Sequence, residues 1–169
     1  VLSQMGRKIN TEKYKRILLC LREKSPQASL GADVIVGFPG ETEKDFMQTY
    51  KFLEQSPLTY FHIFSYSPRP GTVASSWKQV NGKVKKKRGF LLRELSKRKN
   101  VNFRLLFVGK ECEAIVVKKG EAWDEVLTSN YLKVSVPPSP VKEKEAVMVR
   151  VTEVSSRETK GKIIGLLTP

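Results

Sequence analysis

The hydrophobic periodicity of this 169-residue chain changes near Val108, and that change constrains its fold more than any other feature. Before Val108, apolar residues alternate between helical spacing and short β-branched runs. The predicted elements are helices over residues 11–24 and 83–107, a helix starting at Thr42, and strands over residues 30–36 and 58–66. Thr11 and Thr42 are the predicted N-caps of the first two helices.

Strand, helix and strand joined by short loops form the βα unit of an α/β sheet or barrel. Too few strands are present to complete either one. After Val108 the pattern becomes β-rich over residues 111–117, 126–136, 146–154 and 160–166, which predicts a small antiparallel β-barrel. We therefore predict two domains: residues 1–108, the end of an α/β barrel with a long basic helix, and residues 109–169, the small β-barrel.

The charge of the chain is large and unevenly distributed. The 31 Lys and Arg residues exceed the 17 Asp and Glu residues and give a formal charge of +14, which indicates a polyphosphate partner. Residues 78–108 hold eleven basic side chains and one acidic one, Glu94. Within them, Lys85, Lys86, Lys87 and Arg88 form either a phosphate-contacting surface or a solvated helix face.

Residues 37–42 leave the carboxyl end of a predicted strand and enter a helix, where ligands bind in α/β folds. Gly37 and Gly40 would let the backbone approach a ligand, and Glu41 could accept hydrogen bonds from ribose hydroxyls. The alternative is a tight turn in which Glu41 only offsets the helix dipole. A short glycine motif alone favours the turn.

The residues with metal-binding side chains are few. Cys20 and Cys112 lie too far apart for a zinc site or a disulfide framework, and no Cys-x-x-x-Cys-x-x-Cys spacing occurs, so we predict no metal site. His62 lies in an apolar run and is expected to be a core residue.

The low cysteine content and the lack of a long apolar run favour a cytoplasmic protein without a membrane segment.

Residues 130–134 place an aromatic side chain and a lysine within the predicted small barrel. Oligonucleotide-binding barrels use such a mixture, in which aromatic rings stack on bases and lysines contact phosphates. Packing of Tyr131 at a barrel corner is an equally good interpretation.

These segments together resemble a known family. Residues 1–8, 33–42 and 64–72 are similar, in order and spacing, to the later barrel segments of radical S-adenosylmethionine methylthiotransferases. Residues 108–161 resemble the RNA-binding TRAM domain of those enzymes. The amino-acid sequences of residues 67–72 and 130–134 are most similar to those of the branch that modifies threonylcarbamoyladenosine in tRNA.

The resemblance implies an enzyme that adds a methylthio group to an adenosine derivative in tRNA. Its cofactors would be S-adenosylmethionine and two 4Fe-4S clusters. This chain has neither cysteine triad and starts without Met, so we expect a fragment that holds no catalytic residue and is inactive alone. The fragment would supply part of the cofactor site and the RNA-binding module.

The resemblance also assigns roles to individual residues. Arg7 would bind the cofactor carboxylate, and Phe64 and Arg69 would lie beside the adenine. The other predicted cofactor-binding residues are the strand-end residues Ile35 and Gly37 and the loop residues Pro39, Gly40 and Glu41. The predicted RNA-binding residues are Lys85, Lys86, Lys87, Arg88, Lys110, Asn130, Tyr131 and Lys133.

Two other functions fit the same sequence. One is a non-catalytic RNA-binding protein that has a partial α/β barrel, and the other is a methylthiotransferase that modifies a ribosomal protein. An incomplete barrel would also leave a strand edge open, which predicts self-association through that edge.

Overall fold

The computed structural model describes residues 1–167 and divides the chain into two compact units, of which the second begins at Asn100. The division falls inside α3 (Gly82–Leu105). The boundary at Val108 that we expect from the hydrophobic period lies just after this helix. The packing boundary lies earlier because Phe103 and Phe107 belong to the core of the second unit.

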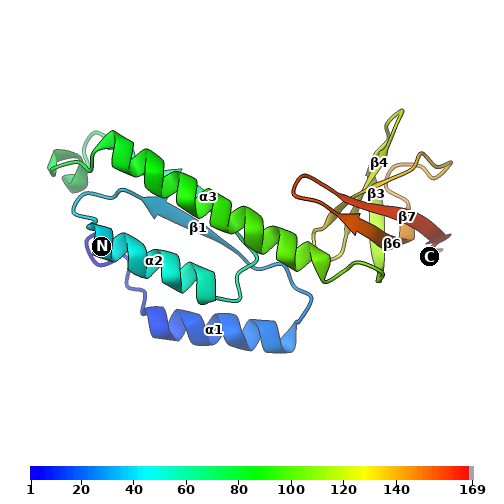
Figure 1. Ribbon diagram of the computed structural model, residues 1–169, viewed down its shortest axis with the longest axis horizontal. Helices are drawn as coiled ribbons and strands as arrows, with labels where there is room; N and C mark the ends of the chain where they lie inside the picture. Colours follow the sequence, from blue (N-terminus) through cyan, green and yellow to red (C-terminus); the bar gives the residue numbers. More distant parts are fainter. Residues whose placement is uncertain (168–169) are drawn as a thin grey trace. The chain divides into compact units, whose positions relative to one another are not determined.

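The first unit has the α/β architecture expected from the sequence (Figure 1). Its elements before α3 are α1 (Thr11–Lys24), β1 (Gly31–Val36), α2 (Glu43–Gln55), β2 (Tyr60–Ser65) and the short 3-10 helix η1 (Val73–Ser76). The strands β1 and β2 pair in parallel, and within the described residues each of them pairs on one side only. No helix in residues 1–167 is long and apolar enough to span a membrane.

The two faces of the β1–β2 sheet differ. One face packs on helices in a core made by Leu18, Val36, Phe46, Leu53, Leu58, Phe61, Leu92 and Leu95. The other face exposes Ile35 and Phe64, which lie in register, and the neighbouring register pair Asp33 and His62. Our expectation that His62 is a core residue is therefore wrong: alternation along β2 places it on the exposed face, which no helix of residues 1–167 covers.

The two predicted helix caps differ in outcome. Thr42 is the N-cap of α2, as predicted, and forms a capping box with Asp45. The hydroxyl and N–H of Thr42 hold the pKa of Asp45 below its ordinary value. At α1 the cap is Asn10, whose side chain accepts a hydrogen bond from the Lys13 N–H at 3.0 Å. The prediction for Thr11 is wrong because Thr11 is already the first helical residue.

The second unit contains a closed five-stranded barrel in the order β3-β4-β5-β7-β6. Its strands are β3 (Glu111–Lys118), β4 (Asp124–Thr128), β5 (Lys133–Val136), β6 (Ala146–Val154) and β7 (Thr159–Leu166). The predicted barrel is confirmed with one difference: β5 and β7 pair in parallel, so the barrel is mixed rather than wholly antiparallel. The single stretch predicted over residues 126–136 is two strands that join at a turn.

A buried carboxylate joins two loops of the barrel. The side chain of Asp124 is fully buried and accepts hydrogen bonds from the Lys119 ammonium, the Gly120 N–H and the N–H and hydroxyl of Ser139. Burial by itself would raise the pKa of this carboxyl, but the hydrogen bonds outweigh burial and hold the pKa below its ordinary value. Asp124 is therefore charged in the folded barrel.

We expect Asp124→Asn to lower the free energy of unfolding of the barrel by about 2–3 kcal/mol, because the donors lose a charged acceptor. The parent gains its Asp124 contribution fully above the unfolded pKa near 3.8 and loses it as the pH falls through the lower folded pKa. Urea unfolding between pH 2 and 7, followed by Trp123 fluorescence in a Trp77→Phe background, measures both effects.

Glu121→Gln is the matched control, since Glu121 is an exposed carboxylate in the same loop. Its unfolding should match that of the parent at every pH. An Asp124→Asn barrel that loses stability in acid as steeply as the parent would contradict the assigned role of Asp124.

Candidate functional site

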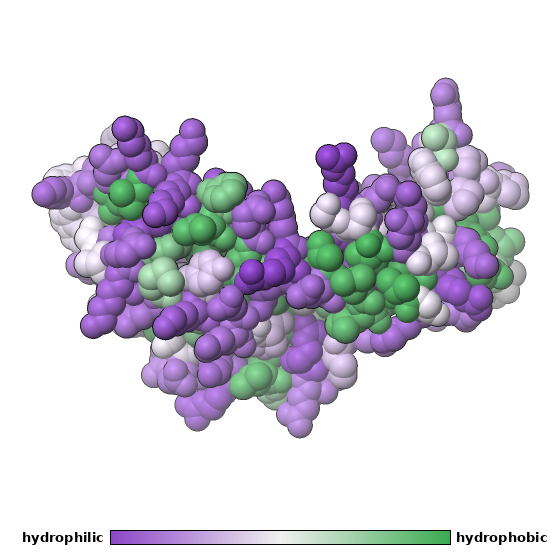
Figure 2. Space-filling view, viewed as in Figure 1, coloured by the Kyte–Doolittle hydropathy of each residue, from purple (hydrophilic) through white to green (hydrophobic). Residues whose placement is uncertain are grey.

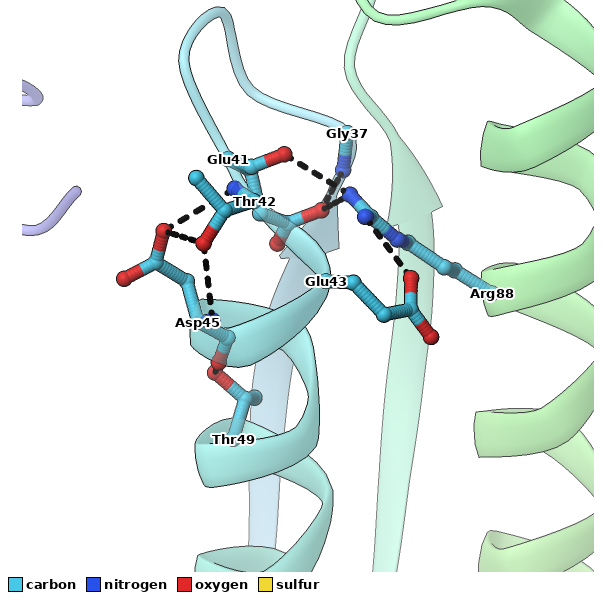
Figure 3. A network of polar contacts seen from close by, with 7 residues as sticks. All are labelled: Gly37, Glu41, Thr42, Glu43, Asp45, Thr49 and Arg88. Atoms are coloured by element: carbon cyan, nitrogen blue, oxygen red, sulfur yellow. Dashed lines mark hydrogen bonds and ion pairs between the residues drawn. The ribbon is translucent and has the colours of Figure 1, made fainter.

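The loop between β1 and α2 is held by a buried carboxylate (Figure 3). Glu41 Oε2 accepts a hydrogen bond from the Gly37 N–H at 2.8 Å, and the Glu41 N–H donates to the Phe38 carbonyl. Gly37 and Gly40 have φ values of 73° and 85°, in the left-handed region that favours glycine. The loop is thus closed on itself by its own glutamate.

Arg88 of α3 reaches the same carboxylate. Its Nη1 lies 2.6 Å from Glu41 Oε2 and 3.1 Å from the Glu41 carbonyl, while its Nη2 lies 3.0 Å from a Glu43 oxygen. The guanidinium also lies over the Phe46 ring, and only 5% of Arg88 is exposed. Our expectation that Arg88 contacts RNA does not fit this position, because its guanidinium is buried against carboxylates.

Lys85 lies one helical turn before Arg88 and packs on the loop as well. A Cβ added at Gly37 would lie 2.2 Å from Lys85 Cγ, so the lysine stem occupies the space that a larger residue would need. The Lys85 ammonium donates to the Tyr66 carbonyl at 3.1 Å. The glycine at position 37 therefore has a packing reason that requires no ligand.

The basic run consequently divides into two faces. Residues three apart share a helix face, so Lys85 and Arg88 point inward while Lys86 and Lys87 are exposed. The visible surface of the first unit is mostly hydrophilic in Figure 2. The i, i+3, i+7 spacing of Lys85, Arg88 and Leu92 is the sequence signal for this division.

The predicted cofactor-binding residues divide by exposure in the same way. Gly37, Pro39 and Glu41 are buried, whereas Arg7, Ile35, Gly40, Phe64 and Arg69 are exposed. Ile35 and Phe64 are register partners on the open face of the sheet. Arg7 lines an open pocket of about 520 Å³ together with Ser3, Gly6, Lys8, Ile9 and Asn10.

The donor set of the chain does not fit an iron–sulfur cluster. Within residues 1–167 no group of three or more Cys, His, Asp or Glu side chains could hold a metal ion. Cys20 is exposed on α1, and Cys112 is half-buried in β3, where burial raises the pKa of its thiol.

The predicted RNA-binding residues of the barrel lie near one end of it. The Ser129 N–H donates to the Glu113 carbonyl, which holds the β4–β5 turn beside the start of β3, where Lys110 precedes the strand. Tyr131 is 79% exposed, Lys110 and Lys133 are exposed, and Asn130 is half-buried. The structure brings these four residues to one region of the surface.

The buried Glu41–Arg88 pair makes a sharp test of what stabilises the loop. We expect Arg88→Met to lower the free energy of unfolding of the first unit by about 3–5 kcal/mol, because it leaves the Glu41 carboxylate buried without its partner. Urea unfolding followed by Trp77 fluorescence in a Trp123→Phe background measures this change, since the Trp77 ring packs edge-on against Phe38 of the loop.

Arg98→Met serves as the control, because Arg98, which also lies on α3, makes an exposed ion pair with Glu54 of α2. Exposed pairs contribute about 0–1 kcal/mol, so this variant should unfold almost like the parent. Equal losses in the two variants would refute a special role for the buried pair.

Comparison with known proteins finds relatives that are named tRNA-modifying enzymes, although no protein-family model matches the chain. The threonylcarbamoyladenosine tRNA methylthiotransferase of Aquifex aeolicus is 40% identical over 135 residues, which are 79% of this chain and 32% of that protein. The tRNA-2-methylthio-N(6)-dimethylallyladenosine synthase of a Wolbachia pipientis strain is 36% identical over 167 residues, which are 95% of this chain and 38% of that protein.

A third relative is a probable threonylcarbamoyladenosine tRNA methylthiotransferase of Pyrococcus horikoshii. It is 30% identical over 165 residues, which are 97% of this chain and 38% of that protein. The chain thus spans about a third of the length of these relatives. Over most of its length, the chain is a homologue of the tRNA methylthiotransferases, the family that its sequence motifs resemble.

Proposed function

We propose that this chain is part of an enzyme that adds a methylthio group to an adenosine derivative in tRNA, acting in the cytoplasm. The observation that carries the proposal is the similarity to tRNA methylthiotransferases over most of the chain. The succession of a parallel α/β unit and a closed five-stranded barrel supports it. The α/β unit would contribute part of the cofactor site, and the barrel would bind RNA.

The modified nucleoside that we propose is threonylcarbamoyladenosine. Relatives named for this nucleoside and relatives named for dimethylallyladenosine have similar identities to the chain. The amino-acid sequences of residues 67–72 and 130–134 favour the threonylcarbamoyladenosine branch.

The cofactor site that we propose uses the open face of the β1–β2 sheet. S-adenosylmethionine would supply the hydrogen-abstracting chemistry when it is bound. Ile35 and Phe64 would contact its apolar parts, and Arg7 would bind its carboxylate. Glu41 and Gly37 would act indirectly, because their mutual hydrogen bond and Arg88 hold the loop in shape.

The nucleoside content of tRNA tests the proposed reaction directly. In a strain without the gene for this chain, we expect mass spectrometry of digested tRNA to show loss of the methylthio form and accumulation of unmodified threonylcarbamoyladenosine. Restoring the parent gene should restore the methylthio form. Loss of methylthio-dimethylallyladenosine instead would correct the branch.

Two alternatives predict different results in the same strain. A ribosomal-protein methylthiotransferase would leave the tRNA nucleosides intact and remove a methylthio group from a ribosomal protein. A non-catalytic RNA-binding protein, which the lack of a metal-binding group in residues 1–167 favours, would leave both unchanged. Either result would overturn the proposed reaction.

The exposed lysines of α3 are proposed to contact tRNA phosphates. Each phosphate contact releases counterions, so affinity should fall steeply with salt. We expect Lys86→Gln combined with Lys87→Gln to reduce the slope of log affinity against log salt concentration by about 1.5. Anisotropy titrations of labelled tRNA at several salt concentrations measure this slope.

Lys44→Gln combined with Lys51→Gln on α2 is the matched control, since these two lysines are also exposed. An equal change in slope in both double variants would show that only the total charge matters. Within residues 1–167 β1 and β2 each have one unpaired edge, which also supports self-association. Sedimentation of the chain at increasing concentration would reveal or exclude it.

A further inference from the structure

Trp123 is an exposed aromatic side chain that lies outside the sequence motifs described above. It lies immediately before β4 and is 47% exposed. The Lys160 ammonium lies 5.6 Å from the centroid of its ring, within the range of a cation–π contact. A large aromatic ring beside a cation is the combination that binds a nucleotide, because the ring stacks on the base and the cation meets phosphate.

The support beneath Trp123 is rigid. Its neighbour Asp124 is fully buried and bonded to Lys119, Gly120 and Ser139, so the backbone that carries the indole is fixed to two loops. A Cβ added at Gly120 would lie 2.4 Å from the Trp123 carbonyl, which shows how tightly the loop closes. A ring that is held in place loses little conformational entropy when a ligand stacks on it.

Tyr131 has a second rigid support on the β4–β5 turn. Its N–H donates to the Thr128 carbonyl at 2.9 Å, and the Leu132 N–H donates to the Thr128 hydroxyl at 2.9 Å. Tyr131 adopts a φ of 64°, a left-handed conformation that costs a non-glycine residue about 1 kcal/mol. The turn uses this conformation to hold a ring that is 79% exposed.

The two aromatic residues lie at opposite ends of β5. Asp124, next to Trp123, is the register partner of Val136 at the end of β5, and Tyr131 precedes the start of the strand. Val134 and Val136 point into the barrel core, so alternation directs Lys133 and Ser135 outward. Lys160 is the register partner of Ser135 and lies on the same outer face.

We propose that this surface, the β5 track, binds a short single-stranded segment of the RNA substrate. The track consists of Trp123, Tyr131, Lys133, Ser135 and Lys160. One base stacks on Trp123 and another on Tyr131, and Lys133 and Lys160 contact the phosphates between them. The inference rests on the proposed function, which supplies the RNA.

The charge balance of the track predicts how it binds. Lys133 lies 3.1 Å from Glu125, and Lys160 lies 3.2 Å from Glu158 and 4.0 Å from Glu153. The carboxylates largely cancel the charge of the two lysines. Stacking rather than counterion release therefore provides most of the affinity, in contrast to the lysines of α3.

The chain has two tryptophans, so Trp77→Phe leaves Trp123 as the only one. Titration of this variant with an eight-nucleotide oligoadenylate RNA should quench the Trp123 fluorescence. In anisotropy titrations with the same fluorescein-labelled RNA, Trp123→Ala should weaken binding about tenfold with an unchanged salt slope. Trp123→Phe keeps a stacking ring and should restore most of the affinity.

The controls separate stacking from misfolding and from charge. Trp77→Phe should bind like the parent, and Trp123→Ala should keep the thermal unfolding temperature of the parent. A Trp123→Ala variant that is folded and binds as tightly as the parent would overturn the β5 track. So would competition by polyglutamate as effective as that by RNA, because the surface would then select only negative charge.

The proposed function is tested separately by tRNA itself. If the chain binds tRNA while oligoadenylate leaves Trp123 fluorescence unchanged, the β5 track is wrong and the proposed RNA-binding role remains. If neither RNA binds at low salt, both are wrong.

Discussion

The first unit depends on the buried ion pair between Glu41 and Arg88. A carboxylate with little exposure requires a partner, since an unpaired buried charge is strongly destabilising. Arg88 supplies that partner, and the Gly37 N–H adds a hydrogen bond to the same oxygen. One interaction thereby joins the end of β1, the start of α2 and the N-terminal part of α3, and Figure 3 shows all three converging on Glu41.

The barrel uses the same device with different residues. Asp124 joins the loop after β3 to the loop after β5, as Glu41 joins elements of the first unit. In both units a buried carboxylate organises backbone near a surface that we propose to bind a ligand.

Much of the architecture followed from sequence periodicity. The positions of the helices and of most strands were predictable from the spacing of apolar residues. Apolar residues recur every three to four positions in a helix and every two positions in a strand. Faces were harder. His62 was expected inside and lies outside, because alternation does not say which face of a two-stranded sheet the helices cover. The parallel β5–β7 pair also had no sequence signal, since strand pairing is set by the closure of the barrel.

The sequence by itself determined the two-part architecture, the basic character of the long helix, and the motifs shared with tRNA methylthiotransferases. Only the tertiary structure decided which basic side chains of α3 are exposed and which are buried. Lys86 and Arg88 belong to one basic run, and the packing of α3 on the loop buries Arg88 and leaves Lys86 exposed. The physical reason is that a charge is taken out of water only where the fold brings a partner to it, and Glu41 lies 47 residues away in the chain.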